Sequence, residues 1–326
     1  MASALDFSVV PSGVDDLILD ASTPEDWLIE DLLQRGDQVV VAAQPKLGKS
    51  LLCTQIQIAL ASGSSFLMWE VKKRVKTLYI NLEINAKQIA IRLIKQAGGE
   101  DEFQEIKETL FVENEFKSLD INSEDHFNGL VEYIGRISPD VVVWDVLSRI
   151  HSCDENDNLR MAKTMLLIRQ ASGTAASIVV HHTRKPPAGM EEKNQGAFGI
   201  RGASSIHGEA DLVMVLSKKG GIKGGGYSLS FSARNIEEPE EMTLKLSKDL
   251  IFYSYEEDKQ NELKKAVLEA FGEYKVLSSI NLNDFMRNYF NVKNRSASSY
   301  MKSALNYGFI SHERMKDKTH QYTVLI

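Results

Sequence analysis

The sequence predicts an α/β fold with a mainly parallel β-sheet and an antiparallel extension, followed by a small helical domain. Three observations support this. Short apolar runs alternate with amphipathic stretches from residue 38 to residue 182, a Gly-Lys-Ser loop joins the first run to the first helix, and the pattern changes again near residue 259. Strands that are apolar throughout, each followed by a helix, are typical of parallel sheets covered by helices on both faces.

The length of 326 residues allows one large core and a smaller unit. We expect an N-terminal arm at residues 1–35, an α/β domain at 36–257 and a small domain at 258–326. The arm contains a candidate packing patch of Trp27, Leu28, Ile29, Leu32 and Leu33.

In the α/β region, strands and helices are predicted from the spacing of apolar residues, in short apolar runs for strands and at helical spacing for helices. Strands are predicted at residues 38–42, 77–81, 110–112, 141–144 and 177–180. Helices are predicted at residues 51–61, 87–97, 124–137 and 159–171. Ligands of such sheets bind at the carboxyl ends of the strands.

Residues 183–199 are rich in Lys, Pro, Gly and Gln and show no periodicity, which indicates a long functional loop. Four successive strands are expected after it, at residues 212–216, 227–233, 242–246 and 250–255. Their short connections favour an antiparallel extension of the sheet.

The last 68 residues read as three helices, at 261–271, 283–289 and 296–306, and a hairpin of residues 309–314 and 321–326. This is the layout of a winged helix. Although the net charge of the chain is −7, residues 259–326 carry 11 Lys and Arg against 6 Asp and Glu. The third helix presents Arg295, Ser298, Ser299 and Lys302, so duplex DNA is a candidate partner, and a replication protein is the other.

A phosphate-binding loop is predicted between the first strand and the first helix. Gly48 lets the backbone wrap an anion, Lys49 reaches the β- and γ-phosphate oxygens of ATP, and Ser50 can bind Mg²⁺. The nucleotide-binding segment consists of Ala43, Gln44, Pro45, Lys46, Leu47, Gly48, Lys49, Ser50 and Leu51. Ala43 stands where the pattern has its first Gly, and we expect it to remove the freedom of positive φ there.

Two carboxylates stand at the ends of later strands. Asp145 follows the run 139–144, and a buried carboxylate there favours Mg²⁺ as its partner. Glu83 follows the run 78–82 and could orient or deprotonate the water that attacks ATP. Both also have ordinary readings, because Asp145 could cap a turn and Glu83 could stabilise the start of the next helix.

His181 and His182 end a third strand of the sheet. Without another His or Cys at ligand-like spacing, a zinc site is not expected. We expect the pair to sense the γ-phosphate through hydrogen bonds. The simpler interpretation is that these strand-end histidines form hydrogen bonds with the backbone alone.

The cysteine and hydropathy patterns indicate a cytoplasmic protein without a membrane partner. Only Cys53 and Cys153 are present, no charged segment with an apolar run opens the chain, and no apolar run approaches the about 18 residues of a membrane span.

The set of motifs resembles RecA-like hexameric ATPases, and among them the RepA-type replicative helicases of plasmids and mobile elements. The resemblance spans about residues 27–255. It is carried by the loop at 43–50, Leu82-Glu83, residues 145–149 and 154–157, residues 180–185, residues 201–205, and Ala233-Arg234-Asn235.

This resemblance implies a RecA-like fold and a homohexameric ring with ATP and Mg²⁺ bound between subunits. Arg234 would act as the arginine finger in the neighbouring site, and Arg201 is the competing candidate. Residues 183–199 and 201–205 would line a central channel for single-stranded DNA, with Arg184, Lys185 and Lys193 on its phosphates.

We therefore expect an ATP hydrolase that translocates on single-stranded DNA as a replicative helicase. The alternative is a DNA-binding regulator or helicase loader that is switched by nucleotide and does not unwind DNA. Two departures from the family pattern, Ala43 and Val146 in place of Pro, leave the ATP affinity and turnover rate open.

Overall fold

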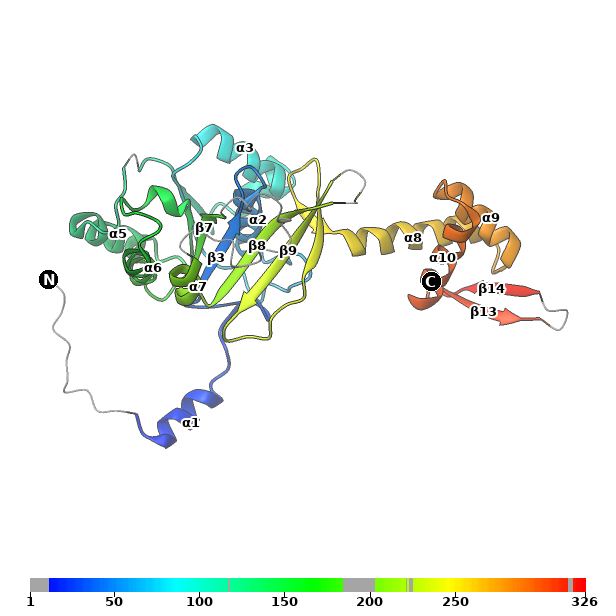
Figure 1. Cartoon of the computed structure of the whole chain (residues 1–326), viewed down its shortest axis with the longest axis horizontal. Coiled ribbons are helices and arrows are strands. Elements are labelled where there is room, and N and C mark those ends of the chain that lie inside the picture. Colours follow the sequence, from blue (N-terminus) through cyan, green and yellow to red (C-terminus); the bar gives the residue numbers. More distant parts are fainter. Residues whose placement is uncertain (1–11, 117, 184–202, 221, 223–224, 316–318) are drawn as a thin grey trace. The chain divides into compact units, whose positions relative to one another are not determined.

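The computed structural model describes residues 12–116, 118–183, 203–220, 222, 225–315 and 319–326. The chain forms two compact units (Figure 1). The first contains residues 1–216 and 230–240, and the second contains residues 217–229 and 241–326.

The predicted parallel sheet is present. Its hydrogen-bonded strand order is β11-β10-β9-β8-β3-β7-β6-β4-β5. Within the first unit, β3 pairs in parallel with β7 and β8, β6 with β7 and β4, and β4 with β5. The bounds are β3 Gln38–Ala43, β4 Thr77–Asn81, β5 Leu110–Glu113, β6 Val141–Asp145, β7 Ala176–His182 and β8 Leu212–Lys219.

Helices cover both faces of this sheet in the first unit (Figure 1). Alternate strand residues such as Val40 and Trp144 pack with α5, α6 and α7, and the strand residues between them face α2. The helices are α2 Lys49–Ser62, α3 Ala86–Ala97, α4 Glu100–Gln104, α5 Glu124–Ile137, α6 Asn158–Ser172 and α7 Ala203–Glu209, with the 3₁₀ turn η1 at Leu147–Arg149. This arrangement brings the carboxyl ends of β3, β4, β6 and β7 to one edge, as the sequence predicts.

A small hairpin precedes β3. Its strands are β1 Trp27–Ile29 and β2 Leu33–Gln34. Four apolar residues of the predicted packing patch are at most 2% exposed: Leu28, Ile29, Leu32 and Leu33. The patch is therefore part of the folded core, whereas the helix before it, α1 Val14–Ser22, buries none of its residues.

The predicted antiparallel strands follow β8. They are β9 Gly226–Ala233, β10 Met242–Leu246 and β11 Phe252–Ser254, and β10 is antiparallel to both β9 and β11. β11 starts two residues later than predicted. Leu250 has a φ of 65° and closes a turn with Ser247, which prevents it from extending the strand.

The C-terminal part of the second unit has its own core, formed by Leu263, Phe271, Met286, Met301 and their neighbours. Its elements are α8 Tyr255–Phe271, β12 Val276–Ser278, α9 Ser279–Tyr289, α10 Asn294–Asn306, β13 Ile310–Arg314 and β14 His320–Val324. The three strands form a sheet of order β12-β14-β13. α8 begins earlier than predicted because Ser254 caps it by accepting a hydrogen bond from the Glu257 N–H.

None of the described helices combines the length and the apolar character that a membrane span requires.

Candidate functional site

The phosphate-binding loop has the geometry that its sequence predicts. Gly48, the residue directly before α2, is left-handed with a φ of 99°, and Lys46 has a φ of 67°. Two positive-φ residues turn the chain sharply between β3 and α2, so that backbone N–H groups near the helix N-terminus can face an anion. Lys49 is 5% exposed, and its ammonium group donates to the Gln44 carbonyl at 3.2 Å.

The expectation about Ala43 needs correction. Ala43 is the last residue of β3, is fully buried and pairs with His182 in the neighbouring strand. It is not among the positive-φ residues. An alanine at this position therefore causes no backbone strain, because the left-handed turns of the loop are made by Lys46 and Gly48.

Asp145 is the last residue of β6, and its side chain lies inside the protein. Only 1% of the residue is exposed, the Tyr79 hydroxyl donates to its Oδ2, and its Oδ1 accepts no hydrogen bond within the described residues. Burial raises the pKa of Asp145, opposed by the hydrogen bond from Tyr79 and by the nearby Ser50 hydroxyl. A buried carboxylate oxygen without a partner is suited to a cation.

Glu83 lies in the turn after β4, two residues beyond the strand, and is exposed. Asn81 shapes this turn: its side-chain oxygen accepts from the Ile84 N–H at 3.2 Å, and its amide donates to the Ile84 carbonyl and to Asn114 at 2.6 Å each. The sequence prediction did not single out Asn81 or Tyr79. A polar residue that ends an apolar strand was the available signal for Asn81.

The electrostatics place Lys49, Glu83 and Asp145 at one site. Burial lowers the pKa of Lys49, and the charges of Glu83 and Asp145 oppose that shift. Asp145 lies on β6, and Glu83 follows β4. These two strands are paired so that Asn81, the last residue of β4, lies opposite Asp145. The structure thus brings together the groups that a phosphate transfer needs: a cation for phosphate, a buried acid for a metal and an exposed acid for water.

His181 and His182 end β7, where they pair with Ala42 and Ala43 of β3. His181 is fully buried and His182 is partly exposed. They therefore lie beside the start of the phosphate-binding loop. Within the described ranges, no three His, Cys, Asp or Glu side chains are grouped in a way that could hold a metal ion.

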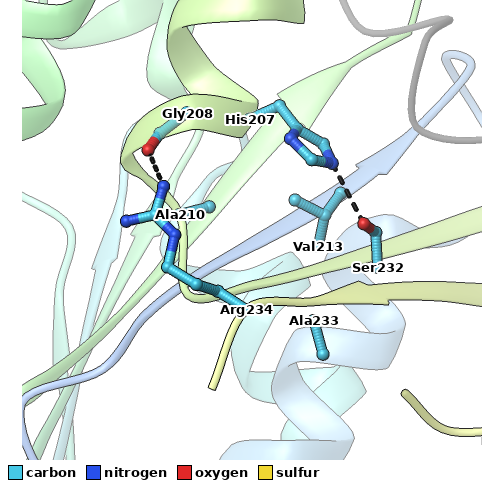
Figure 2. A pocket seen from close by; sticks show the side chains of 7 residues that line it. All are labelled: His207, Gly208, Ala210, Val213, Ser232, Ala233 and Arg234. Carbon is cyan, nitrogen blue, oxygen red and sulfur yellow. Dashed lines mark hydrogen bonds between the residues drawn. The ribbon is translucent and has the colours of Figure 1, made fainter. Parts of the chain in front are cut away.

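Arg234 follows β9 and lies at a pocket of about 230 Å³ (Figure 2). Its guanidinium group donates to the Gly208 carbonyl in the last turn of α7, and the His207 ring is 3.0 Å from the Ser232 hydroxyl across the same pocket. The pocket is lined by His207, Gly208, Ala210, Val213, Ser232, Ala233 and Arg234.

Arg234 lies at the opposite edge of the sheet from the phosphate-binding loop of its own chain. Its N–H donates to the Asp211 carbonyl, and the Asp211 N–H donates to the carbonyl of Gln38, the first residue of β3. The loop begins at the other end of β3, five residue steps or about 16 Å away. In its present position, Arg234 cannot contact a nucleotide bound by the same chain.

Four predicted DNA-binding residues, Arg184, Lys185, Lys193 and Arg201, lie outside the described residues. Lys302 is described and is exposed on α10, as are Arg295, Ser298 and Ser299. The basic face expected on this helix is therefore present.

A family described as an AAA domain matches residues 7–188, which is more than half of the chain. The chain belongs to this AAA domain family. The match covers the phosphate-binding loop, Glu83, Asp145 and the two histidines. A comparison with curated protein sequences finds no significant match.

Solved structures similar to this AAA domain protein include an isolated ATPase domain, which has 12% sequence identity and a TM-score of 0.57, with 75% of this chain and 99% of that chain covered. A DnaB-like replicative helicase, solved for its interactions with primase, has 13% identity and a TM-score of 0.52, with 67% of this chain and 59% of that chain covered. A KaiC-like protein from Pyrococcus horikoshii has 13% identity and a TM-score of 0.49, with 70% and 93% covered.

The predicted RecA-like fold is confirmed by the isolated ATPase domain and by the DnaB-like helicase. Together with the AAA domain match, it supports an ATPase. At these identities, the similarities to solved structures show the fold of the AAA domain protein alone.

Proposed function

We propose that this protein is a Mg²⁺-dependent ATPase motor that assembles as a homohexamer and translocates on single-stranded DNA. In this proposal it is the replicative DNA helicase of a plasmid or another mobile element. The observation that carries the proposal is the division of the catalytic groups between two edges of the sheet. Lys49, Asp145 and Glu83 meet at one edge, and Arg234 lies at the other.

The residues at the first edge fit ATP and Mg²⁺. The N–H groups at the start of α2 and the Lys49 ammonium group would hold the phosphates, and Ser50 with Asp145 would hold the metal. The fit rests on the buried Oδ1 of Asp145, which accepts no hydrogen bond within the described residues, and on the left-handed Gly48. Bound Mg²⁺ would neutralise charge that develops on the phosphates.

In this proposal, Glu83 acts on water rather than on the metal. It is exposed, unlike Asp145, and its turn is fixed through Asn81. We assign it the role of holding the attacking water and taking its proton. His181 and His182, beside the loop, would respond to the γ-phosphate through hydrogen bonds.

A neighbouring subunit would complete the site with Arg234. In a head-to-tail ring, each subunit offers one edge of its sheet to the opposite edge of the next, so an arginine that is distant from its own site can enter another. Its charge would stabilise the transition state there. Arg201 remains the competing candidate for this role.

DNA contacts are proposed in two places. Arg184, Lys185 and Lys193 would bind single-stranded phosphates in the central channel, without reading sequence. Residues 258–326 would form a winged-helix domain after the ATPase domain at 36–257, and the exposed face of α10 with Arg295 and Lys302 would contact duplex DNA or a replication protein.

That basic face also supports a second candidate. A protein whose α10 recognises duplex DNA could use ATP to control assembly rather than movement, as a regulator or a helicase loader. The two functions differ in the nucleic acid that stimulates hydrolysis.

The test is steady-state ATP hydrolysis with Mg²⁺, measured alone, with single-stranded DNA and with duplex DNA, together with the particle mass in a non-hydrolysable ATP analogue. We expect stimulation by single strands in a particle of about six chains. Stimulation by duplex DNA alone would favour the regulator. Hydrolysis by a stable monomer, at a rate that neither DNA changes, would contradict both candidate functions.

A further inference from the structure

A single side chain, that of Asn81, closes the turn that carries Glu83. Its Oδ1 accepts hydrogen bonds from the N–H groups of Glu83 at 3.4 Å and Ile84 at 3.2 Å, and its Nδ2 donates to the Ile84 carbonyl at 2.6 Å. Asn81 is 3% exposed, so water does not compete for these contacts. The backbone at Glu83 therefore depends on how the Asn81 amide lies.

The Asn81 amide has one orientation that suits this turn. If the amide were turned over, its nitrogen would face the N–H groups of Glu83 and Ile84, and its oxygen would face the Ile84 carbonyl. Each contact would then bring together two donors or two acceptors. An asparagine at the end of a strand often closes a turn through its oxygen alone. Here the nitrogen is used as well, which fixes the orientation of the amide.

Asn114 holds the Asn81 amide from the neighbouring strand. It follows β5, which pairs with β4, and its Oδ1 accepts from Asn81 Nδ2 at 2.6 Å. With this bond, Asn81 uses both of its amide donors. The bond crosses from one strand end to the next, so the turn at Glu83 is tied to the residue that follows β5.

The same turn is tied to β6 on its other side. The Leu82 N–H donates to the Asp145 carbonyl at 2.8 Å, and Asn81 lies opposite Asp145 in the paired strands. The turn is thus held between the strand that ends in the buried acid and the residue that follows β5. Support from both sides can keep a water-binding carboxylate within about 0.5 Å of its productive position, as catalysis requires.

We propose that Asn81 and Asn114 are positioning residues for Glu83 in ATP hydrolysis. Asn81 would fix the turn, Asn114 would fix the Asn81 amide, and neither would contact ATP or the attacking water. An exposed carboxylate in a turn needs such support, because a displacement of about 1 Å can cost about a hundredfold in rate. This inference rests on the role of Glu83 in the proposed function and adds the groups through which the fold places it.

ATP hydrolysis by the full-length chain with Mg²⁺ tests the proposal. Asn81→Ala should lower kcat about thirtyfold and Asn114→Ala about tenfold, while KM and the affinity for an ATP analogue stay within about threefold of the parent. Asn114→Asp should keep kcat within about threefold of the parent, because its carboxylate can still accept from Asn81. A loss of kcat in Asn114→Asp as large as that in Asn114→Ala would contradict the assigned role of Asn114.

Asn81→Asp tests the two donations of the amide. It keeps the shape of the side chain and its acceptor contacts, but one carboxylate oxygen would face the Ile84 carbonyl, which now accepts from the amide nitrogen at 2.6 Å. We expect kcat to fall at least about tenfold. Thermal melts and binding of the ATP analogue show whether each variant is folded, and the half-buried Asn114 provides the test if the Asn81 variants do not fold.

Asn122→Ala is the matched control. Asn122 is half-buried in the same unit, and its Nδ2 donates to Asp120 at 3.4 Å and to Thr164 at 3.2 Å rather than to the turn at Glu83. Its removal should leave kcat at the parent value. If Asn122→Ala lowered kcat as much as Asn114→Ala, loss of any asparagine bond in this unit would explain both, and the proposal would be wrong.

Double variants show whether the two asparagines act through Glu83. When Glu83→Gln has already removed the carboxylate, Asn81→Ala or Asn114→Ala should change the residual single-turnover rate by at most about threefold, because the group that they position is lost. A further fall as large as the one in the parent chain would show that they act independently of Glu83. That result would overturn the proposal.

The two proposals fail in different ways. If Glu83→Gln is inactive while Asn81→Ala and Asn114→Ala both hydrolyse ATP at the parent rate, the positioning role is excluded and Glu83 remains the base. If Glu83→Gln turns over at the parent rate, the role of Glu83 in the proposed function is excluded, and the positioning role with it, whatever the asparagine variants do.

Discussion

Tyr79 donates a hydrogen bond to Oδ2 of Asp145, and the other carboxylate oxygen of Asp145 accepts none within the described residues. Both residues are buried, on the neighbouring strands β4 and β6. Burial in this pair raises the pKa of Asp145 and raises that of Tyr79 well above its ordinary range. The phenol thus fixes the orientation of the carboxylate and leaves one oxygen for a metal ion.

Replacing Tyr79 by Phe removes this hydrogen bond and keeps the ring in the core. Groups that orient a metal-binding carboxylate typically contribute ten- to a hundredfold to metal affinity or activity. We expect the Mg²⁺ concentration for half-maximal ATP hydrolysis to rise about tenfold, while hydrolysis continues at saturating Mg²⁺. Tyr133→Phe is the control, since it removes a similar hydrogen bond, from Tyr133 to Glu113 at 2.6 Å, that does not involve Asp145. An unchanged Mg²⁺ requirement would contradict the assigned role of Tyr79.

Glu83→Gln tests the proton acceptor. The amide keeps the size of the side chain and loses its basicity, so we expect hydrolysis to fall by about two to four orders of magnitude. ATP-analogue binding and assembly should be retained because Lys49 and Asp145 are unchanged. Glu105→Gln, an exposed position on the same unit, should hydrolyse ATP at the parent rate. Turnover by Glu83→Gln within threefold of the parent would exclude Glu83 as the base.

Arg234→Ala tests action in the neighbouring site. We expect a loss of about a thousandfold or more in hydrolysis, which added ATP does not restore, because the residue acts on the transition state. Mixing inactive Arg234→Ala with inactive Glu83→Gln should recover part of the activity. A site with Glu83 from the first chain and Arg234 from the second is complete.

The control for this mixing experiment is Arg136→Ala on α5, which removes an exposed arginine and should be active alone. No recovery at any mixing ratio, with mixed particles shown by mass, would place Arg234 outside the shared site. The same experiment with Arg201→Ala decides between the two finger candidates.

Much of the site could be predicted from the sequence because parallel strands place their carboxyl ends at one edge. The Gly-Lys-Ser pattern located Gly48 and Lys49, and the strand-end rule located Glu83, Asp145 and the two histidines. The bond between Tyr79 and Asp145 could not be predicted, since it depends on the pairing of β4 with β6, and Tyr79 reads as an ordinary apolar strand residue. The position of Arg234, at the edge of the sheet opposite the phosphate-binding loop, could not be predicted either. It depends on β9 running antiparallel to the central strands.

The remaining misreadings come from local backbone conformation. Ala43 was expected to affect a positive-φ position, but the left-handed residues are Lys46 and Gly48. Leu250 was assigned to a strand and lies in a turn. Helix α8 starts early because a serine cap and the acidic first turn of Glu256, Glu257 and Asp258 favour a helix N-terminus, although the apolar periodicity begins later.

The basic face of α10 can be tested by Arg295→Ala/Lys302→Ala. If this face contacts duplex phosphates, the affinity for duplex DNA should fall. The negative slope of the logarithm of the binding constant against the logarithm of the salt concentration should become shallower by about one to two, roughly one for each lost contact. Single-strand-stimulated hydrolysis should be retained, since the motor site lies in the first unit. Lys264→Ala/Lys265→Ala on α8 removes the same charge and serves as control. Unchanged duplex binding would favour a protein partner for α10.

A pH-dependent stability is expected from Asp37, which precedes β3. Burial, opposed by a hydrogen bond from the Gln34 N–H, raises its pKa to about 6. Between about pH 4 and 6 the folded chain therefore holds a proton that the unfolded chain has lost, so the free energy of unfolding falls as pH rises through this window.

Asp37→Asn should remove that fall and keep the 2.7 Å bond, because its amide oxygen can still accept. With a discount for partial exposure, we expect the variant to be more stable by about 1 kcal/mol at pH 8, or a few degrees in Tm, and unchanged at pH 4. Thermal melts of Asp37→Asn and of the exposed control Glu108→Gln across this range measure the difference. A variant that is less stable than the parent at pH 8 would show that the Asp37 carboxylate is stabilised in the fold, by Arg169, rather than destabilised by burial.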